Sequence, residues 1–277
     1  MDIKVEPIKP LLGAVVRCDK ATMFEPGFAE KIKEVLRDRG ALVFPQLNFT
    51  DQEQLAFTDT LGDRLNFTNN VPGSDLSAKD VYTITLDKDV NNENEYVWGS
   101  MYWHQDGITS AIPPSPITLL SCKSKAEQGG QTEFSNTAAA FEVLSPEEQA
   151  KLEKLRVIHS TAAAVREIKS RDQLNPQRAS MEHEHPLVWT RPDGRKALIL
   201  GCHADYIVGM DKVAGRLIIN RLLEWCSRPE FTIRHQWTVG DFAMWDNCTM
   251  LHRAVPYAED SGRRMHRTSV AGAVELA

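Results

Sequence analysis

The sequence lacks the features of several large protein classes. No apolar run approaches the roughly 20 residues that span a membrane, and "MDIKVEPIKPLL" at the N-terminus has no basic segment followed by an apolar one. Lys and Arg number 32 against 38 Asp and Glu, a net charge of −6, which disfavours binding to nucleic acid or anionic membranes. We therefore expect a cytoplasmic protein with a small-molecule partner, and neither nucleic acid nor membrane as partners.

Cysteine is scarce and scattered. The five cysteines form no Cys-x-x-Cys pair, so the sequence predicts neither a disulfide framework nor a zinc knuckle. Glycine-rich phosphate motifs are absent as well, because no Gly-x-Gly-x-x-Gly and no Walker A segment occurs. Nucleotide-binding folds of those two kinds are therefore excluded.

The order of the expected elements favours a β-rich fold. With no repeat, low-complexity tract or linker, the chain reads as one domain, 1–277. Helical spacing predicts helices over 26–40, 51–62 and 213–226, and a helix after Ser145. Short β-branched and aromatic runs predict strands at 41–45, 81–87, 117–122, 196–201, 231–237, 241–245 and 265–272. Strands and helices do not alternate regularly, so an antiparallel sandwich with helical insertions fits best.

A potential ligand pair lies in "MYWHQDGITS" (101–110), where His104 and Asp106 stand two positions apart. On an extended strand, side chains i and i+2 project to the same side and can share one ion. His252 follows an expected strand and a turn at Asp246-Asn247, which could return it to this pair. Two histidines and a carboxylate on one side of an ion form the facial triad of non-heme Fe(II) oxygenases.

The wider pattern resembles the TauD/TfdA family of Fe(II)- and 2-oxoglutarate-dependent dioxygenases. The resemblance rests on "WHQD", "GGQTEF", "WDNCTMLHRA" and "RRMHRTSVAG", and it covers nearly the whole chain. The order is His-x-Asp, a Thr 28 residues after the first His, the distal His, and two Arg that follow it by 11 and 15 residues. The resemblance implies a mainly β double-stranded β-helix, or jelly roll, with flanking helices.

The same resemblance implies roles for individual residues. His104, Asp106 and His252 would ligate Fe(II), and Arg263 with Thr132 would bind the distal carboxylate of 2-oxoglutarate. With O2, such an enzyme hydroxylates a small organic substrate and releases succinate and CO2. If the attacked carbon bears O, N or S, the product can then fall apart. If the register of this strand were shifted by one residue, the neighbouring Arg264 would take the role of Arg263.

Other residues are predicted to contact the substrate. Arg267 follows Arg263 on the same strand face and is expected to bind an anionic group. Two alternatives are neutralisation by a structural acid such as Glu133 or Asp241, and hydrogen bonding to a neutral substrate. His203 falls where relatives carry an aromatic side chain in the substrate pocket. In "LGDRLNFTNN" (61–70) the histidine of taurine-cleaving relatives is missing, so taurine is not favoured. Phe67 and Asn69 stand there instead, and indicate an apolar substrate body.

Several alternatives stay open at this stage. A divalent-metal hydrolase or isomerase on the same jelly roll would use the same three ligands but leave Thr132 and Arg263 without a role. The non-enzyme alternative is a jelly-roll binding member that has lost turnover. His183 and His185 form a second pair, which we interpret as an exposed loop residue and a structural residue at the start of a strand. Segments 88–101 and 161–184 are expected to be lids. Relatives commonly form dimers or tetramers, so we expect a homo-oligomer.

Overall fold

The computed structural model describes residues 2–66, 80–91, 94–110 and 114–273. The strands are β1 Lys4–Lys9, β2 Leu12–Arg17, β3 Ala41–Phe44, β4 Tyr82–Ile84, β5 Ile117–Ser124, β6 Thr132–Asn136, β7 Arg156–Ser160, β8 Glu182–Pro186, β9 Val188–Thr190, β10 Lys196–Leu198, β11 Ala204–Ile207, β12 Thr232–His235, β13 Phe242–Asp246, β14 Met250–Ala254 and β15 Arg264–Ser269. The α-helices are α1 Phe28–Arg39, α2 Asp51–Leu61, α3 Asn94–Gly99, α4 Thr137–Glu142, α5 Pro146–Leu152, α6 Thr161–Ala164, α7 Pro176–Ala179 and α8 Lys212–Cys226. Three 3-10 turns are η1 Ala21–Phe24, η2 Arg171–Gln173 and η3 Pro229–Phe231.

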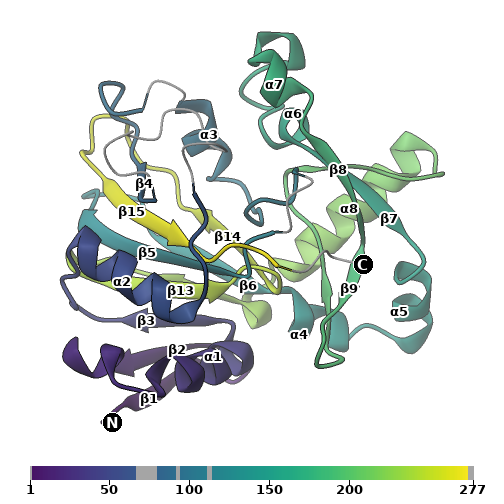
Figure 1. Cartoon of the computed structure of the whole chain (residues 1–277). Coiled ribbons are helices and arrows are strands. Elements are labelled where there is room, and N and C mark those ends of the chain that lie inside the picture. Colours follow the sequence, from purple (N-terminus) through teal and green to yellow (C-terminus); the bar gives the residue numbers. More distant parts are fainter. Residues whose placement is uncertain (1, 67–79, 92–93, 111–113, 274–277) are drawn as a thin grey trace.

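Two sheets form the centre of the molecule. The large sheet has the order β1-β2-β3-β13-β5-β15-β4, and the small one the order β12-β6-β14 (Figure 1). Except for the parallel pair β2 and β3, neighbouring strands of both sheets run antiparallel. One core cluster joins the sheets, because it combines Val43 and Trp245 of the large sheet with Phe134 and Met250 of the small one. This is the jelly roll that the family resemblance implied.

Helices cover the outer face of the large sheet. Leu42 and Phe44 of β3 pack with Phe28 of α1 and Phe57 of α2, whereas Val43 between them faces the small sheet. On strand β13, Met244 likewise packs with the helices, whereas its two neighbours face the small sheet, as the two-residue period of a strand requires. Each strand is therefore apolar on both sides, which explains why "ALVF" is a continuous hydrophobic run.

A second group of elements lies to the right in Figure 1, where the sheet β11-β7-β8 stands beside α8 and α5. Its core cluster includes Val157 of β7, Ile207 of β11, Leu222 of α8 and Trp103, the residue before the first ligand candidate. The short helices α6 and α7 project from the same side (Figure 1). The buried ring of Trp103 therefore anchors the segment that carries His104 to this group of elements.

Most expected elements appear, with several corrections. Thr50 and Glu53 form the capping box of α2, and Ser145 caps α5 by accepting a hydrogen bond from Glu148 N–H. The strand expected at 81–87 shrinks to three residues. The prediction that His183 is an exposed loop residue was wrong, because it lies within β8 and is half-buried.

The expected lid segments contain short helices: α3 in 88–101, and α6, η2 and α7 in 161–184. The five cysteines are free thiols. In the part of the chain described here, no helix combines the length and apolar character needed to cross a membrane.

Candidate metal centre

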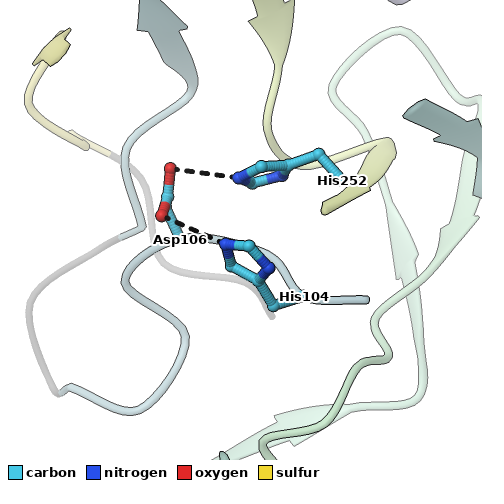
Figure 2. A group of neighbouring side chains, drawn as sticks. All are labelled: His104, Asp106 and His252. Carbon is cyan, nitrogen blue, oxygen red and sulfur yellow. Dashed lines mark ion pairs between the residues drawn. The ribbon is translucent and has the colours of Figure 1, made fainter. Parts of the chain in front are cut away.

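His104, Asp106 and His252 come together at one point between the sheets (Figure 2). One potential ligand atom from each lies within 4.8 Å of the other two. His104 Nε2 is 3.9 Å from Asp106 Oδ1, and His252 Nε2 is 3.5 Å from Asp106 Oδ2. Among the described residues, this is the one group of three or more His, Cys, Asp or Glu side chains close enough to hold a metal ion.

The backbone sets the distance between the two histidines. His104 and His252 form an isolated antiparallel bridge, in which each N–H donates to the other residue's C=O, at 3.1 Å and 3.0 Å. Residues directly opposite in such a bridge hold their side chains close together, and here the ring centroids are 4.1 Å apart. Trp245 also packs against the His252 ring, with 4.7 Å between the ring centroids.

The state of His104 suits a metal ligand. Its Nδ1 lies 2.8 Å from the C=O of Tyr102, and only an Nδ1–H can donate there, which leaves a lone pair on Nε2 facing Asp106. Burial lowers the pKa of His104 to about 3, and the neighbouring His252 acts in the same direction. A neutral imidazole with a lone pair on Nε2 is the form that binds metals.

Asp106 is held by two further side chains. Arg267 Nη1 donates to Oδ1 at 2.7 Å, and the hydroxyl of Thr118 on β5 donates to Oδ2 at 3.1 Å. Burial alone would raise the pKa of Asp106, but Arg267 and the two histidines hold it well below its usual range. The carboxylate is therefore ionised and oriented toward both imidazoles.

The residues between and beyond the ligands fix the loop. Gln105 points away from the cluster, donates to the C=O of Asn247 and Cys248, and accepts from Leu200 N–H. Asn247 is fully buried, and its side chain makes two hydrogen bonds with the backbone of Asp106. It accepts from the N–H at 2.8 Å and donates to the C=O at 2.9 Å.

The extended strand expected through His104 and Asp106 is reduced to the single bridge at His104, because the chain enters a turn at Asp106, followed by Gly107 with φ +77°. The two side chains nevertheless point to the same side (Figure 2).

Arg263 occupies a buried site of its own. It is 3% exposed, its Nε donates to the C=O of Gly130 at 3.0 Å, and its guanidinium stacks on Tyr257 at 4.8 Å. A Cβ at Gly130 would lie 2.9 Å from Arg263 Cδ, so glycine makes room for this side chain. Burial lowers the pKa of Arg263, and no carboxylate among the described residues opposes this effect. A buried guanidinium in this setting favours an anionic ligand.

Thr132 and Arg264 differ in their surroundings. Thr132 is buried, and its oxygen accepts from Trp237 Nε1 at 3.0 Å, so its own proton is available to another acceptor. Arg264, by contrast, is exposed and lies 3.4 Å from Asp87 on the surface. Of the two adjacent arginines, only Arg263 is enclosed by the protein.

A cavity of about 200 Å³ opens beside the cluster. His104, Asp106, His203 and Arg267 contribute to its wall, together with apolar side chains of Ile84, Val97, Ile108 and Val165. His203 Nε2 accepts from Gln105 N–H at 3.1 Å, so its Nδ1–H donates to His159 Nδ1 at 2.7 Å. Burial lowers the pKa of His203 to about 3, which keeps this ring neutral.

Other expectations fall outside this geometry. Phe67 and Asn69 lie outside the described residues. Neither acid proposed to neutralise Arg267 reaches it: Glu133 pairs with Arg234 and Arg253, and Asp241 bonds with His235 and two backbone N–H groups. Arg267 is paired instead with Asp106.

Sequence reasoning missed several residues at this site. They are Thr118, Gln105, and the cavity residues Tyr82, Tyr96 and Arg178. Gln105 stands inside the His-x-Asp motif, so its position could have been noticed. The others come from distant segments and carry no spacing signal.

The chain is similar to known proteins along nearly its whole length. Residues 4–269 match the family described as taurine catabolism dioxygenase TauD, TfdA family. The chain is 30% identical to an alpha-ketoglutarate-dependent 2,4-dichlorophenoxyacetate dioxygenase of Cupriavidus pinatubonensis, over 97% of this chain and 98% of that protein. It is 27% identical to an alpha-ketoglutarate-dependent sulfate ester dioxygenase of Pseudomonas putida, over 100% of this chain and 92% of the other.

A solved structure shows the same fold. The crystal structure of AAD-2 in complex with Mn(II) and N-oxalylglycine superposes with a TM-score of 0.84 at 27% identity, and each chain is covered completely, 100% in both directions. That protein binds a divalent metal together with N-oxalylglycine. The donor set of two imidazoles and one ionised carboxylate described above is chemically suited to a metal of this kind.

Proposed function

Because this chain belongs to the TauD/TfdA family and is an Fe(II)- and 2-oxoglutarate-dependent dioxygenase, we propose that it hydroxylates a small organic acid whose anionic group is bound by Arg267. The observation that carries this proposal is the position of Arg267, which touches Asp106 and lines the cavity next to the two histidines. A substrate bound there lies beside the oxidising centre.

The metal and the co-substrate are assigned to separate residues. His104, Asp106 and His252 would hold Fe(II), which together with 2-oxoglutarate and O2 supplies the oxidising power for C–H hydroxylation and yields succinate and CO2. Arg263 would hold the distal carboxylate of 2-oxoglutarate with its Nη atoms, because its Nε is already bonded to Gly130. Thr132 would add its hydroxyl proton to the same carboxylate.

Arg267 can serve the metal centre and the substrate together. A guanidinium has five N–H donors in a planar fork, so one donor can hold Asp106 while others meet an anion. Tyr82 of β4 stands directly opposite Arg267 of β15, and its ring lies 5.2 Å from the guanidinium and shields it. The apolar side chains of the cavity would bind the substrate body, and His203, whose nitrogens are both engaged by the protein, would contact it through its ring carbons.

The site also determines what kind of product forms. The carboxylate at Asp106 fills the third ligand position, so the reaction is hydroxylation and not transfer of a halide. The two relatives above are named for a phenoxy acid and for sulfate esters, substrates in which oxygen adjoins a carbon. Hydroxylation of such a carbon gives a hemiacetal-like product that breaks its C–O bond, so we propose that ether or sulfate-ester cleavage is the net outcome.

Three further properties are proposed from the sequence pattern and the family resemblance. We propose that residues 1–277 act as one domain, that the enzyme is a dimer or tetramer of identical chains, and that it works in the cytoplasm. Analytical ultracentrifugation and cell fractionation measure the last two properties directly, and limited proteolysis of the intact chain tests the first.

The decisive experiment is a substrate screen. Protein loaded anaerobically with Fe(II) is exposed to O2 and 2-oxoglutarate with phenoxyacetates, alkyl sulfates or alkyl sulfonates, and succinate is measured. We expect substrate-dependent succinate with at least one anionic compound, and none without 2-oxoglutarate. The Arg267→Gln variant should need far more of that compound while its 2-oxoglutarate requirement stays nearly unchanged. Equal use of an uncharged ester or amide by the wild type would overturn the role of Arg267.

A further inference from the structure

The cavity next to the metal centre contains two arginines. Arg267 comes from β15 in the large sheet, and Arg178 comes from α7 in the group of short helices. Each guanidinium lies over a tyrosine ring, Arg267 over Tyr82 at 5.2 Å and Arg178 over Tyr96 at 3.7 Å. One arginine–tyrosine pair therefore belongs to the sheet wall of the cavity, and the other to its helical wall.

The Arg178 pair is fixed in place by its local structure. Asn175 caps α7 by accepting from Gln177 N–H at 2.9 Å, which sets the start of the turn that carries Arg178. Lys169 ion-pairs at 2.7 Å with the buried Glu95, the residue before Tyr96. The α6–α7 segment is thus tied to α3 at two neighbouring points, and Arg178, only 9% exposed, is held at the cavity wall.

The wall of the same cavity also carries apolar side chains from both sides. Ile84 lies on the sheet side, and Val97 and Val165 lie on the helical side. A guanidinium presents a planar fork of N–H donors, which matches a carboxylate or another oxyanion. A cavity wall with one arginine from β15, one from α7 and apolar side chains from both sides is complementary to a molecule with two anionic groups and an apolar body.

We propose that Arg178 binds a second anionic group of the substrate, so that the preferred substrate is a small dianion with an apolar body between its two acid groups. This inference rests on the proposed function, in which Arg267 binds the first anion beside the metal centre. Arg178 is then a specificity-determining residue supplied by a segment that the sequence marked as a lid.

The size of the cavity limits the body of this substrate. A cavity of about 150 Å³ is enough to hold benzene, so the roughly 200 Å³ available here fits one ring or a short chain with its acid groups. Aryl or short alkyl diacids are therefore the expected class. The distal group can be a carboxylate, a sulfonate or a phosphonate, since all three offer oxygens to a guanidinium.

The test compares ligands that differ only at the distal end. Phenoxyacetate, 4-carboxyphenoxyacetate, 4-sulfophenoxyacetate and the neutral 4-carbamoylphenoxyacetate are titrated into protein loaded with Mn(II) and N-oxalylglycine, so that binding is measured without turnover. We expect the wild type to bind at least one of the two diacids about 10-fold to 100-fold more tightly than phenoxyacetate, as a charge-assisted hydrogen bond predicts. The carbamoyl compound should bind no better than phenoxyacetate.

Variants separate Arg178 from general electrostatics. Arg178→Gln should abolish the preference for the diacid and leave phenoxyacetate binding within about threefold, while Arg178→Lys, which keeps the charge, should retain part of it. Arg171→Gln removes one positive charge from the exposed η2 turn of the same segment and should change nothing. If Arg178→Gln keeps the full preference, or if the wild type has none, the proposal is wrong.

The same titration distinguishes this proposal from the one on which it rests. Arg267→Gln should weaken phenoxyacetate and its diacid by similar factors, because both present the same carboxylate to the metal side. If Arg267→Gln leaves phenoxyacetate unaffected, the proposed first anchor fails, whatever Arg178 does. Thermal unfolding of each variant shows whether the fold is retained.

Discussion

Replacing Arg263 with Gln tests the co-substrate site most directly. The guanidinium is buried at 3% exposure and its Nε is fixed on Gly130, so a bound carboxylate meets two pre-oriented Nη groups out of water. Truncating one partner of such a buried charge pair costs about 2–5 kcal/mol. At about 1.4 kcal/mol per factor of ten, the dissociation constant of 2-oxoglutarate should rise roughly 30-fold to several thousand-fold.

The matched control is Arg264→Gln, the same change one position along. Arg264 is exposed and paired only with Asp87 at the surface, where ion pairs contribute about 0–1 kcal/mol, so the affinity should change less than about fivefold. Calorimetric titration of 2-oxoglutarate into anaerobic Mn(II)-loaded protein measures both variants without turnover. A larger loss at Arg264 than at Arg263, or a loss below threefold at Arg263, would refute the assignment.

Three further outcomes follow from the geometry. Alanine at any of the three ligand candidates, His104, Asp106 or His252, should abolish turnover while circular dichroism stays unchanged; normal activity in one of them would remove it from the metal site. Asn247→Asp should weaken Mn(II) binding about 10–100-fold, because a carboxylate cannot donate to the backbone C=O of Asp106; unchanged affinity in a metal titration would contradict this. Burial raises the pKa of Glu133, but its two arginine partners lower it further, so the folded value lies below the ordinary 4.5. Stability from this group is complete above pH 4.5 and is lost as pH falls through the folded pKa, so Glu133→Gln should flatten the acid limb of urea unfolding measured against pH.

Local patterns made much of the fold predictable. The helices expected over 26–40 and 51–62 and the strand expected at 41–45 depend on signals that act within a few residues, and all three appear, as α1, α2 and β3. The short strands β9 and β11 were harder, because three or four residues carry little periodic signal. Strand β9 pairs with β10, and β11 packs against α8, and only the tertiary structure specifies these contacts.

The site, like the fold, has one part that the sequence predicts and another that it does not. Its metal-binding cluster could be found because the family resemblance links His104, Asp106 and His252 across a long gap in sequence, and the structure brings them together. The support of Asp106 by Thr118 could not, since a threonine at the start of a strand resembles any other β-forming residue. Arg178 was hidden for a different reason: it lies in a polar segment without helical periodicity.

The bridge between His104 and His252 is made by main-chain atoms alone. Removing either imidazole should therefore leave the bridge, and the other ligands, where they are. What remains is a vacancy with the outline of an imidazole, bordered by Trp245 on the side of His252. A free imidazole molecule from solution can occupy such an opening and supply the missing ligand nitrogen. In the alanine variants this metal ligand is therefore exchangeable, and substituted imidazoles of chosen basicity can take its place.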